Sequence, residues 1–160
     1  MIGTVEAVCA IALLCTASYF DIRFRRIPNF LCYIGIVLGV VFGLVEQDFT
    51  GHILGMLAGG LPLLLLFYFG LVGGGDVKLM LATGAILGFP LILDVLTLSV
   101  GVGGLLALVM VVHNKTSNRK PDEAATSPPS GVPYAVPALI ACLLTQSFDQ
   151  LRLTWHFATT

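Results

Sequence analysis

Residues Val77–Val112 read VKLMLATGAILGFPLILDVLTLSVGVGGLLALVMVV, and Lys78 and Asp94 are their only charged side chains. As one helix this stretch would extend about 54 Å at 1.5 Å per residue, far beyond a bilayer core of about 30 Å. We therefore expect two membrane-spanning helices here, joined by a tight turn that runs from Phe89-Pro90 to Asp94.

The rest of the chain has the same character. Of its 160 residues, 57% are hydrophobic and 11% are charged, whereas soluble domains carry about 25% charge. This composition excludes an ordinary soluble domain, a disordered chain and a nucleic-acid-binding protein, and it points to a lipid bilayer as the partner. We expect an all-α, polytopic bundle of six transmembrane helices, forming a single domain over residues 1–160. The predicted spans are Ile2–Phe20, Phe30–Val45, Ile53–Val72, Val77–Leu93, Val95–Val112 and Val132–Phe148.

Charged residues avoid these spans, which contain only Glu6 and Lys78. Basic residues favour the cytoplasmic side of a membrane, and Arg152 alone lies on the opposite side from the other seven. Both termini are therefore expected to be extracytoplasmic. The segment His113–Gly131 is rich in Ser, Thr, Pro and charge, which predicts a mobile cytoplasmic loop. The seven basic residues on the predicted cytoplasmic side are Arg23, Arg25, Arg26, Lys78, Lys115, Arg119 and Lys120.

Two aspartates border the spans on one side of the membrane. Asp21 follows the first span and Asp76 precedes the fourth, and the chain crosses the bilayer twice between them. Two neighbouring carboxylates do not both ionise readily, so one remains protonated near neutral pH. Such a pair can hydrolyse a peptide bond: the ionised carboxylate takes a proton from water, while the protonated one polarises the carbonyl. The sequence leaves open which aspartate has which role, and each could instead simply end a helix in water.

The segments around the aspartates narrow this choice. Three glycines, Gly73, Gly74 and Gly75, precede Asp76 and permit positive φ angles and the close approach of an extended substrate strand. Asp21 begins the segment DIRFRRIPN, in which Pro28 fixes a turn at the start of the second span.

Together these segments resemble the type IV prepilin peptidases, which are membrane aspartic proteases of the GxGD type. The resemblance rests on Asp21 upstream of Ile27-Pro28-Asn29 and on Gly73–Lys78, which matches Gly-x-Gly-Asp-x-Lys. Residues 133–138 add a weaker match to a Pro-Tyr-x-x-Pro-Ala pattern. The resemblance implies that Asp21 and Asp76 are catalytic, that no metal or other cofactor is needed, and that prepilin or pseudopilin leaders are removed at the cytoplasmic face of a bacterial inner membrane.

Larger enzymes of that family carry an additional cytoplasmic domain with paired CxxC motifs, and they also methylate the new N-terminus. The four cysteines of this chain form no CxxC pair and are expected to pack as small apolar side chains. The resemblance is therefore to the short branch that serves Flp-type, tight-adherence pili, and we expect no N-methyltransferase activity. The cysteines are Cys9, Cys15, Cys32 and Cys142.

Lys78 and Asn29 are candidate supporting residues, together with Pro28 and the three glycines. The Lys78 ammonium has two interpretations. In the first it lowers the pKa of a carboxylate or holds an acidic residue of the substrate; in the second it contacts lipid phosphate. Asn29 either caps the second span or orients Asp21.

Other polar residues receive structural interpretations. His52, His113 and His156 are scattered over predicted loops and a terminus, so none is expected to bind a metal. Glu6 lies near the outer end of the first span and is expected to reach the membrane interface.

Glycines at helical spacing predict close helix packing within one molecule rather than dimerisation. They fall in the second, third and fifth spans: Gly35, Gly39 and Gly43; Gly55 and Gly59; and the cluster from Gly101 to Gly104.

Two other functions are open. One is a different GxGD protease, acting on signal peptides or on archaeal preflagellins. The second is a small transporter or assembly subunit whose two acids bind protons or cations, although this alternative leaves Ile27-Pro28-Asn29 unexplained. The sequence specifies no oligomeric state.

Overall fold

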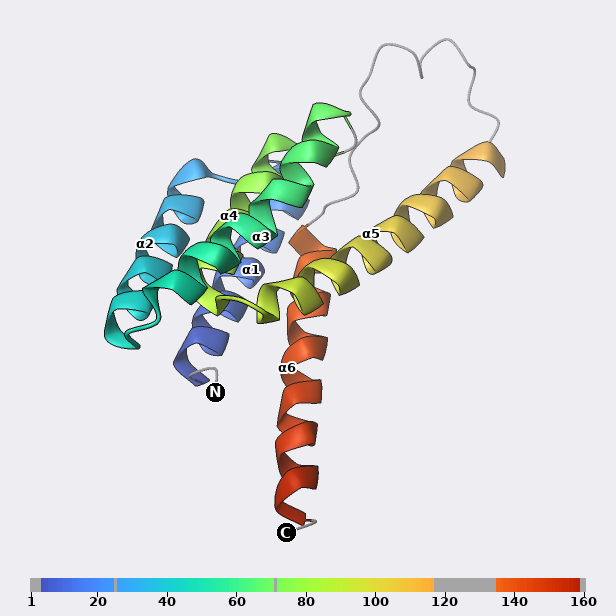
Figure 1. Ribbon diagram of the computed structural model, residues 1–160. Coiled ribbons are helices and arrows are strands. Elements are labelled where there is room, and N and C mark those ends of the chain that lie inside the picture. The colour runs from blue at the N-terminus through green and yellow to red at the C-terminus, as the bar shows by residue number, and fades with distance from the viewer. Residues whose placement is uncertain (1–3, 25, 71, 117–134, 159–160) are drawn as a thin grey trace.

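The computed structural model describes residues 4–24, 26–70, 72–116 and 135–158. All regular elements in these ranges are α-helices, which confirms the all-α prediction (Figure 1). One helix overlaps each predicted span, with different ends. Two of the helices, the first and the third, are long and apolar enough to cross a bilayer, and three shorter apolar stretches accompany them. The helices are α1 (Thr4–Phe24), α2 (Asn29–Val45), α3 (Phe49–Tyr68), α4 (Gly74–Leu87), α5 (Leu91–Thr116) and α6 (Ala135–Ala158).

The turn between α4 and α5 is shorter than expected. α4 ends at Leu87 because Gly88 adopts a φ of 69°, and α5 begins at Leu91 directly after Pro90. Asp94 therefore lies in the first turn of α5 and not in the connection, contrary to the prediction.

The loop predicted for residues 113–131 also begins later than expected. α5 continues to Thr116, so the first four residues of that segment are helical. The remainder lies outside the described residues, as do Pro133 and Tyr134 of the weaker family match.

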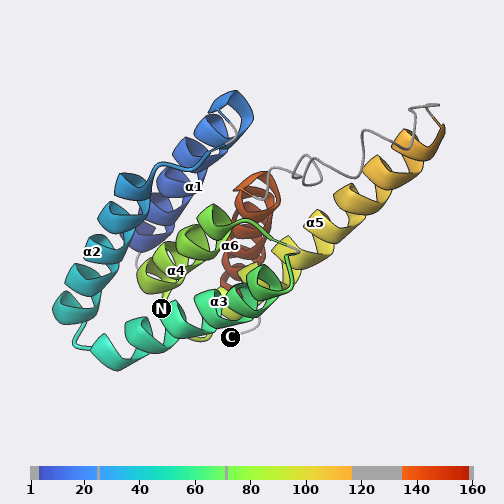
Figure 2. The same ribbon diagram turned by 90° about the horizontal axis from the view of Figure 1, so that it is seen from above.

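α4 is the central helix of the molecule. It packs against α1, α2 and α3, and Figure 2 shows it lying among these three helices. Nearly all its side chains from Leu79 onward are buried. The outward faces of α2 and α3 instead expose large apolar side chains such as Val37 and Leu65, as expected of helices in contact with lipid.

Glycines bring α2 and α3 into close contact with α4. A methyl group added at Gly39 would overlap the carbonyl group of Ala85, and one added at Gly55 would lie 2.5 Å from the carbonyl oxygen of Gly84. The predicted close packing through glycine is therefore present within the chain for the second and third spans.

The prediction fails at Gly101 and Gly104. A methyl group at either position would meet no atom within 4 Å among the described residues. The reason is the direction of α5, whose later turns extend away from the first four helices (Figure 1). α6 contacts both α5 and α1, and its C-terminal end also projects from the group.

Candidate active site

Asp21 and Asp76 lie at the same end of the helix group. Asp21 is in the last turn of α1 and Asp76 is in the first turn of α4, and these two helices pack against each other. The carboxylates are close enough for the charge of Asp21 to raise the pKa of Asp76. We call this region the aspartate end; it comprises Asp21, Asp76, Gly73–Gly75, Lys78 and Asn29.

Asp76 is the more buried member of the pair, and Val77, the next residue of α4, is buried. Burial, and then the neighbouring Asp21 carboxylate, raise the pKa of Asp76 from 3.8 to about 6. The backbone N–H of Gly73 partly opposes this shift by donating a hydrogen bond to Asp76 Oδ2, with an N···O distance of 3.2 Å. Asp76 can therefore gain and lose a proton close to neutral pH.

Asp21 is half-buried between α1 and the start of α6. The backbone N–H of Ala135, the first residue of α6, donates a hydrogen bond to its carboxylate. Such an amide has no partner within its own helix, so the carboxylate satisfies it. Asp21 Oδ2 is buried and has no hydrogen-bond partner among the described residues. That oxygen can accept a proton or a hydrogen bond from a bound molecule.

The three glycines differ from the expectation. Gly73 is the N-cap of α4 with a φ of −77°, while Gly74 and Gly75 are its first helical residues. Among the described glycines, positive φ angles occur at Gly70 and Gly88 instead. The glycine triplet thus begins a helix and does not form a left-handed turn before it, because the Gly73 N–H and the Asp76 carboxylate close the first turn.

Internal packing does not require glycine at Gly74 or Gly75. A methyl group at Gly74 would lie 3.4 Å from the ring of Phe67, and one at Gly75 would lie 3.5 Å from Ile27; both are ordinary contact distances. Gly73 is exposed and its neighbours are half-buried. The backbone beside Asp76 is therefore accessible from outside the helix group.

Lys78 and Asn29 contact each other, which neither interpretation of the sequence included. Lys78 Nζ donates a hydrogen bond to Asn29 Oδ1 at 3.0 Å and thereby joins the start of α4 to the start of α2. Pro28, with a φ of −65°, is the N-cap of α2, and no side chain caps that helix. The proposal that Asn29 caps the second span is therefore wrong, because its side-chain oxygen accepts from Lys78 instead.

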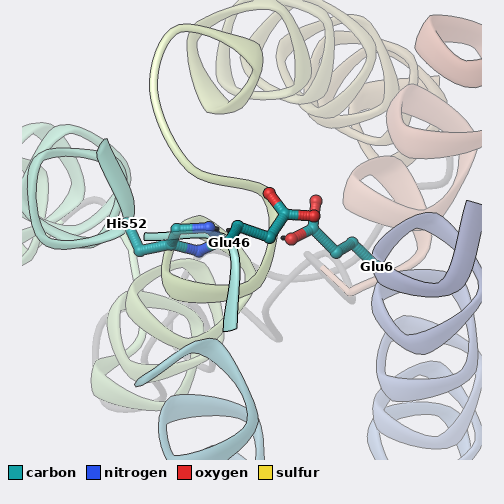
Figure 3. A group of neighbouring side chains, drawn as sticks. All are labelled: Glu6, Glu46 and His52. Atoms are coloured by element: carbon teal, nitrogen blue, oxygen red, sulfur yellow. Dashed lines mark ion pairs between the residues drawn. The ribbon is translucent and has the colours of Figure 1, made fainter. Parts of the chain in front are cut away.

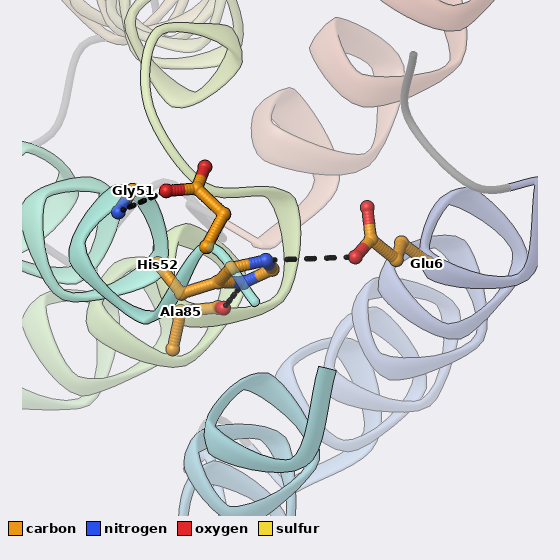
Figure 4. A network of polar contacts seen from close by, with 5 residues as sticks. Glu6, Gly51, His52 and Ala85 are labelled. Atoms are coloured by element: carbon orange, nitrogen blue, oxygen red, sulfur yellow. Dashed lines mark hydrogen bonds and ion pairs between the residues drawn. The ribbon is translucent and has the colours of Figure 1, made fainter. Parts of the chain in front are cut away.

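A second group of ionisable residues lies at the opposite end of the helices. His52, expected in a loop, is in the first turn of α3 and only 5% exposed, and Glu6, expected at the interface, is only 3% exposed. His52 Nε2 lies 3.6 Å from Glu6 Oε1, and His52 Nδ1 lies 2.7 Å from the carbonyl oxygen of Ala85 (Figures 3 and 4). We call Glu6, Glu46, His52 and Ala85 the histidine end.

The sequence contained a signal for this pairing. Glu6 is a charge within an apolar run, and an acid in such a place requires a partner. The alternation of predicted spans that puts the two aspartates at one end also puts His52, just before the third predicted span, at the same end as Glu6. The predictions of a loop position for His52 and an interfacial position for Glu6 were wrong, because helix packing turns these two side chains inward, toward each other.

Comparison with known proteins identifies one family. Its sequence profile, described as the type IV leader peptidase family, matches residues 8–108, which include Asp21, Asn29, Asp76 and Lys78. No curated protein and no solved structure matches the chain.

Proposed function

Because the chain belongs to the type IV leader peptidase family, we propose that it is a membrane aspartic endopeptidase that uses Asp21 and Asp76 to remove the leader from Flp-type prepilins. One observation carries this proposal. The carboxylates of Asp21, in the last turn of α1, and Asp76, in the first turn of α4, lie close enough to interact, and the pKa of Asp76 is raised to about 6. A pair that holds one proton near neutral pH is what the hydrolysis of a peptide bond by carboxylates requires.

In the proposed reaction, the ionised carboxylate takes a proton from a water molecule as the water oxygen attacks the carbonyl carbon of the scissile bond. The protonated carboxyl group donates its proton to the carbonyl oxygen, which gives a neutral tetrahedral diol. When the C–N bond breaks, a proton passes to the leaving nitrogen and the carboxylate pair is restored. The proton belongs to the coupled pair, so either aspartate can begin as the base.

The surroundings of the pair support an extended substrate. The exposed backbone at Gly73 and the small residues that follow it provide room for a strand beside Asp76. A substrate helix must unfold locally to use this space, since its own hydrogen bonds shield each peptide bond. Lys78 is exposed next to this position and can pair with an acidic residue of the precursor, with Asn29 holding the ammonium and Pro28 fixing the start of α2.

We further propose six membrane spans with both termini extracytoplasmic, which places the aspartate end at the cytoplasmic face of a bacterial inner membrane. Prepilin leaders are short and basic and lie on that side. A fused C-terminal alkaline phosphatase should be active in cells and a fused fluorescent protein should not be fluorescent. The reverse pattern would contradict this orientation.

Leader removal tests the function directly. The purified protein in detergent should cleave a Flp-type prepilin, and mass spectrometry should find one new, unmethylated N-terminus. Asp21→Asn and Asp76→Asn should each lower the cleavage rate at least about 10³-fold, since each removes a reacting group. Asp94→Asn is the matched control, because Asp94 is an exposed acid in the first turn of α5.

The outcomes separate the alternatives. Full activity in either aspartate variant would contradict the assigned pair. A methylated product would contradict a peptidase without methyltransferase activity. Cleavage of a signal peptide or a preflagellin, with none of the prepilin, would retain the protease chemistry and change the substrate.

A further inference from the structure

The histidine end gathers three metal-binding side chains from three helices. Glu6 comes from the first turn of α1, His52 from the first turn of α3, and Glu46 is the C-cap residue of α2. One ligand atom from each lies within 4.8 Å of the others (Figure 3). Glu6 is separated from Asp21 by about 22 Å along α1 at 1.5 Å per residue. The group is thus distinct from the proposed active site.

The contact between His52 Nδ1 and the Ala85 carbonyl determines which ring nitrogen carries the proton. A carbonyl oxygen only accepts hydrogen bonds, so the short contact with Ala85 requires that Nδ1 carries a proton. Figure 4 shows the other ring nitrogen, Nε2, facing Glu6. In the neutral ring that nitrogen carries the lone pair. Metal-binding histidines are typically held in this way, with the second ring nitrogen donating to a carbonyl or carboxylate.

The distance between the two side chains fits a shared ion. At 3.6 Å, His52 Nε2 and Glu6 Oε1 are too far apart for a good hydrogen bond. Two ligands at about 2.0–2.1 Å from a tetrahedral Zn²⁺ are separated from each other by about 3.4 Å. The observed separation is close to that value.

We propose that Glu6, Glu46 and His52 bind one divalent transition-metal ion of the Zn²⁺ class. Two carboxylates balance the charge of the ion, and the imidazole favours zinc-like ions over Mg²⁺ and Ca²⁺, which prefer oxygen ligands throughout. Glu6 and His52 are buried, whereas Glu46 is exposed and gives the ion access from water. The bound ion joins α1, the end of α2 and α3, and the Ala85 carbonyl connects the site to α4.

Direct binding tests this proposal without reference to proteolysis. The full chain is purified in detergent with a histidine-free tag and titrated with ZnCl2 by calorimetry. We expect one equivalent to bind, a higher melting temperature that EDTA reverses, and little effect of MgCl2. Zinc-edge X-ray absorption should show nitrogen and oxygen ligands without sulfur, because the proposed ligands are two glutamates and a histidine. The measurement is needed because the four cysteines are free and are themselves possible zinc ligands.

Variants identify the ligands. His52→Gln and Glu6→Gln should abolish saturable binding. Glu46→Gln should weaken it at least about tenfold, and because Glu46 is exposed this variant does not threaten the fold. Asp48→Asn is the matched control: Asp48 is an exposed acid two residues further on that accepts from Gly51 N–H, and asparagine preserves that cap.

Three results would overturn the proposal. These are the absence of saturable zinc binding by the parent protein, ligation by sulfur, and parental affinity in Glu46→Gln. If His52→Gln lowers the melting temperature while zinc and EDTA have no effect on the parent, His52 and Glu6 form an ion pair and not a metal site.

Discussion

The two ends of the helix group contain ionisable side chains in opposite arrangements. At the aspartate end, two like charges are half-buried beside exposed groups, and burial and repulsion keep a proton on the pair near neutral pH. At the histidine end, an acid faces a base, and both are almost fully buried. Burial therefore acts on two different pairs: at the aspartate end a like charge adds to it and raises the pKa of Asp76, whereas at the histidine end the carboxylate faces an imidazole.

α4 connects the two ends. Its first turn contains Asp76, and the carbonyl of Ala85 near its last turn accepts from His52. Close contacts with glycines of α2 and α3 hold this helix in place. The comparison therefore makes five predictions, which run from the largest expected change to the smallest.

The largest change is expected from His52→Leu. This variant leaves the buried Glu6 carboxylate without its imidazole partner and should lower the free energy of unfolding by about 3–5 kcal/mol, measured by denaturant titration in detergent. The double variant Glu6→Leu/His52→Leu removes both buried polar side chains and should recover most of the loss. A loss below about 1 kcal/mol in the single variant would mean that the histidine end is not structural.

Gly39→Ala tests the anchoring of α4. The added methyl group would overlap the Ala85 backbone, so α4 must shift, at a cost of about 1–3 kcal/mol in stability. Because α4 serves both ends, prepilin cleavage should also decrease. Gly101→Ala is the control: it meets no described atom within 4 Å and should stabilise the helix by about 0.5–1 kcal/mol. Equal effects of the two variants would contradict the central role of α4.

The pH dependence of cleavage tests the aspartate pair. The reaction needs one protonated carboxyl group, and the pKa of Asp76 is about 6. As the pH rises above this value the pair loses its proton, so the cleavage rate should fall about tenfold per pH unit, or 1.4 kcal/mol.

The pKa of Asp76 itself, measured by infrared spectroscopy, should respond to a substitution at the aspartate end and not to one at the histidine end. Asp21→Asn removes the like charge and should lower the pKa of Asp76, as followed by the infrared band of the protonated carboxyl group. His52→Leu lies at the far end and should leave that pKa unchanged. A lower pKa in the second variant would show that the two ends are not independent.

The smallest effect is expected from Asn29→Ala. It removes the exposed hydrogen bond from Lys78 Nζ and should lower the free energy of unfolding by less than about 1 kcal/mol. Asn29→Asp retains an acceptor and should preserve stability. If Asn29→Ala lowers the free energy of unfolding as much as His52→Leu does, the contacts at the aspartate end contribute as much to stability as those at the histidine end.

The sequence predicted the fold better than the site. The all-α architecture and the helix positions follow from apolar runs, because a chain in lipid must satisfy its backbone internally and does so with helices. Helix ends were less predictable: α5 begins at Leu91 and not after Asp94, because the left-handed conformation of Gly88 ends α4 so abruptly. The family resemblance, based on the segments around Asp21 and Asp76, is confirmed by the profile match.

Within the site, the sequence predicted which end of the helices holds each aspartate but not its contacts. The Ala135 amide on Asp21 and the Lys78–Asn29 hydrogen bond join residues far apart in the chain. Such contacts depend on how closely the helices approach and how they are rotated about their axes. Periodicity does not encode these quantities in a chain that is apolar on nearly every face.

By itself, the sequence predicted that this protein is helical and apolar, and that Asp21 and Asp76 lie at the same end of the helices, because two apolar helices separate them along the chain. Only the tertiary structure decided the proton affinity of Asp76 and the pairing of Glu6 with His52. Both depend on burial and on the charge of a neighbour from another helix, and these exist only after α1, α3 and α4 have packed together.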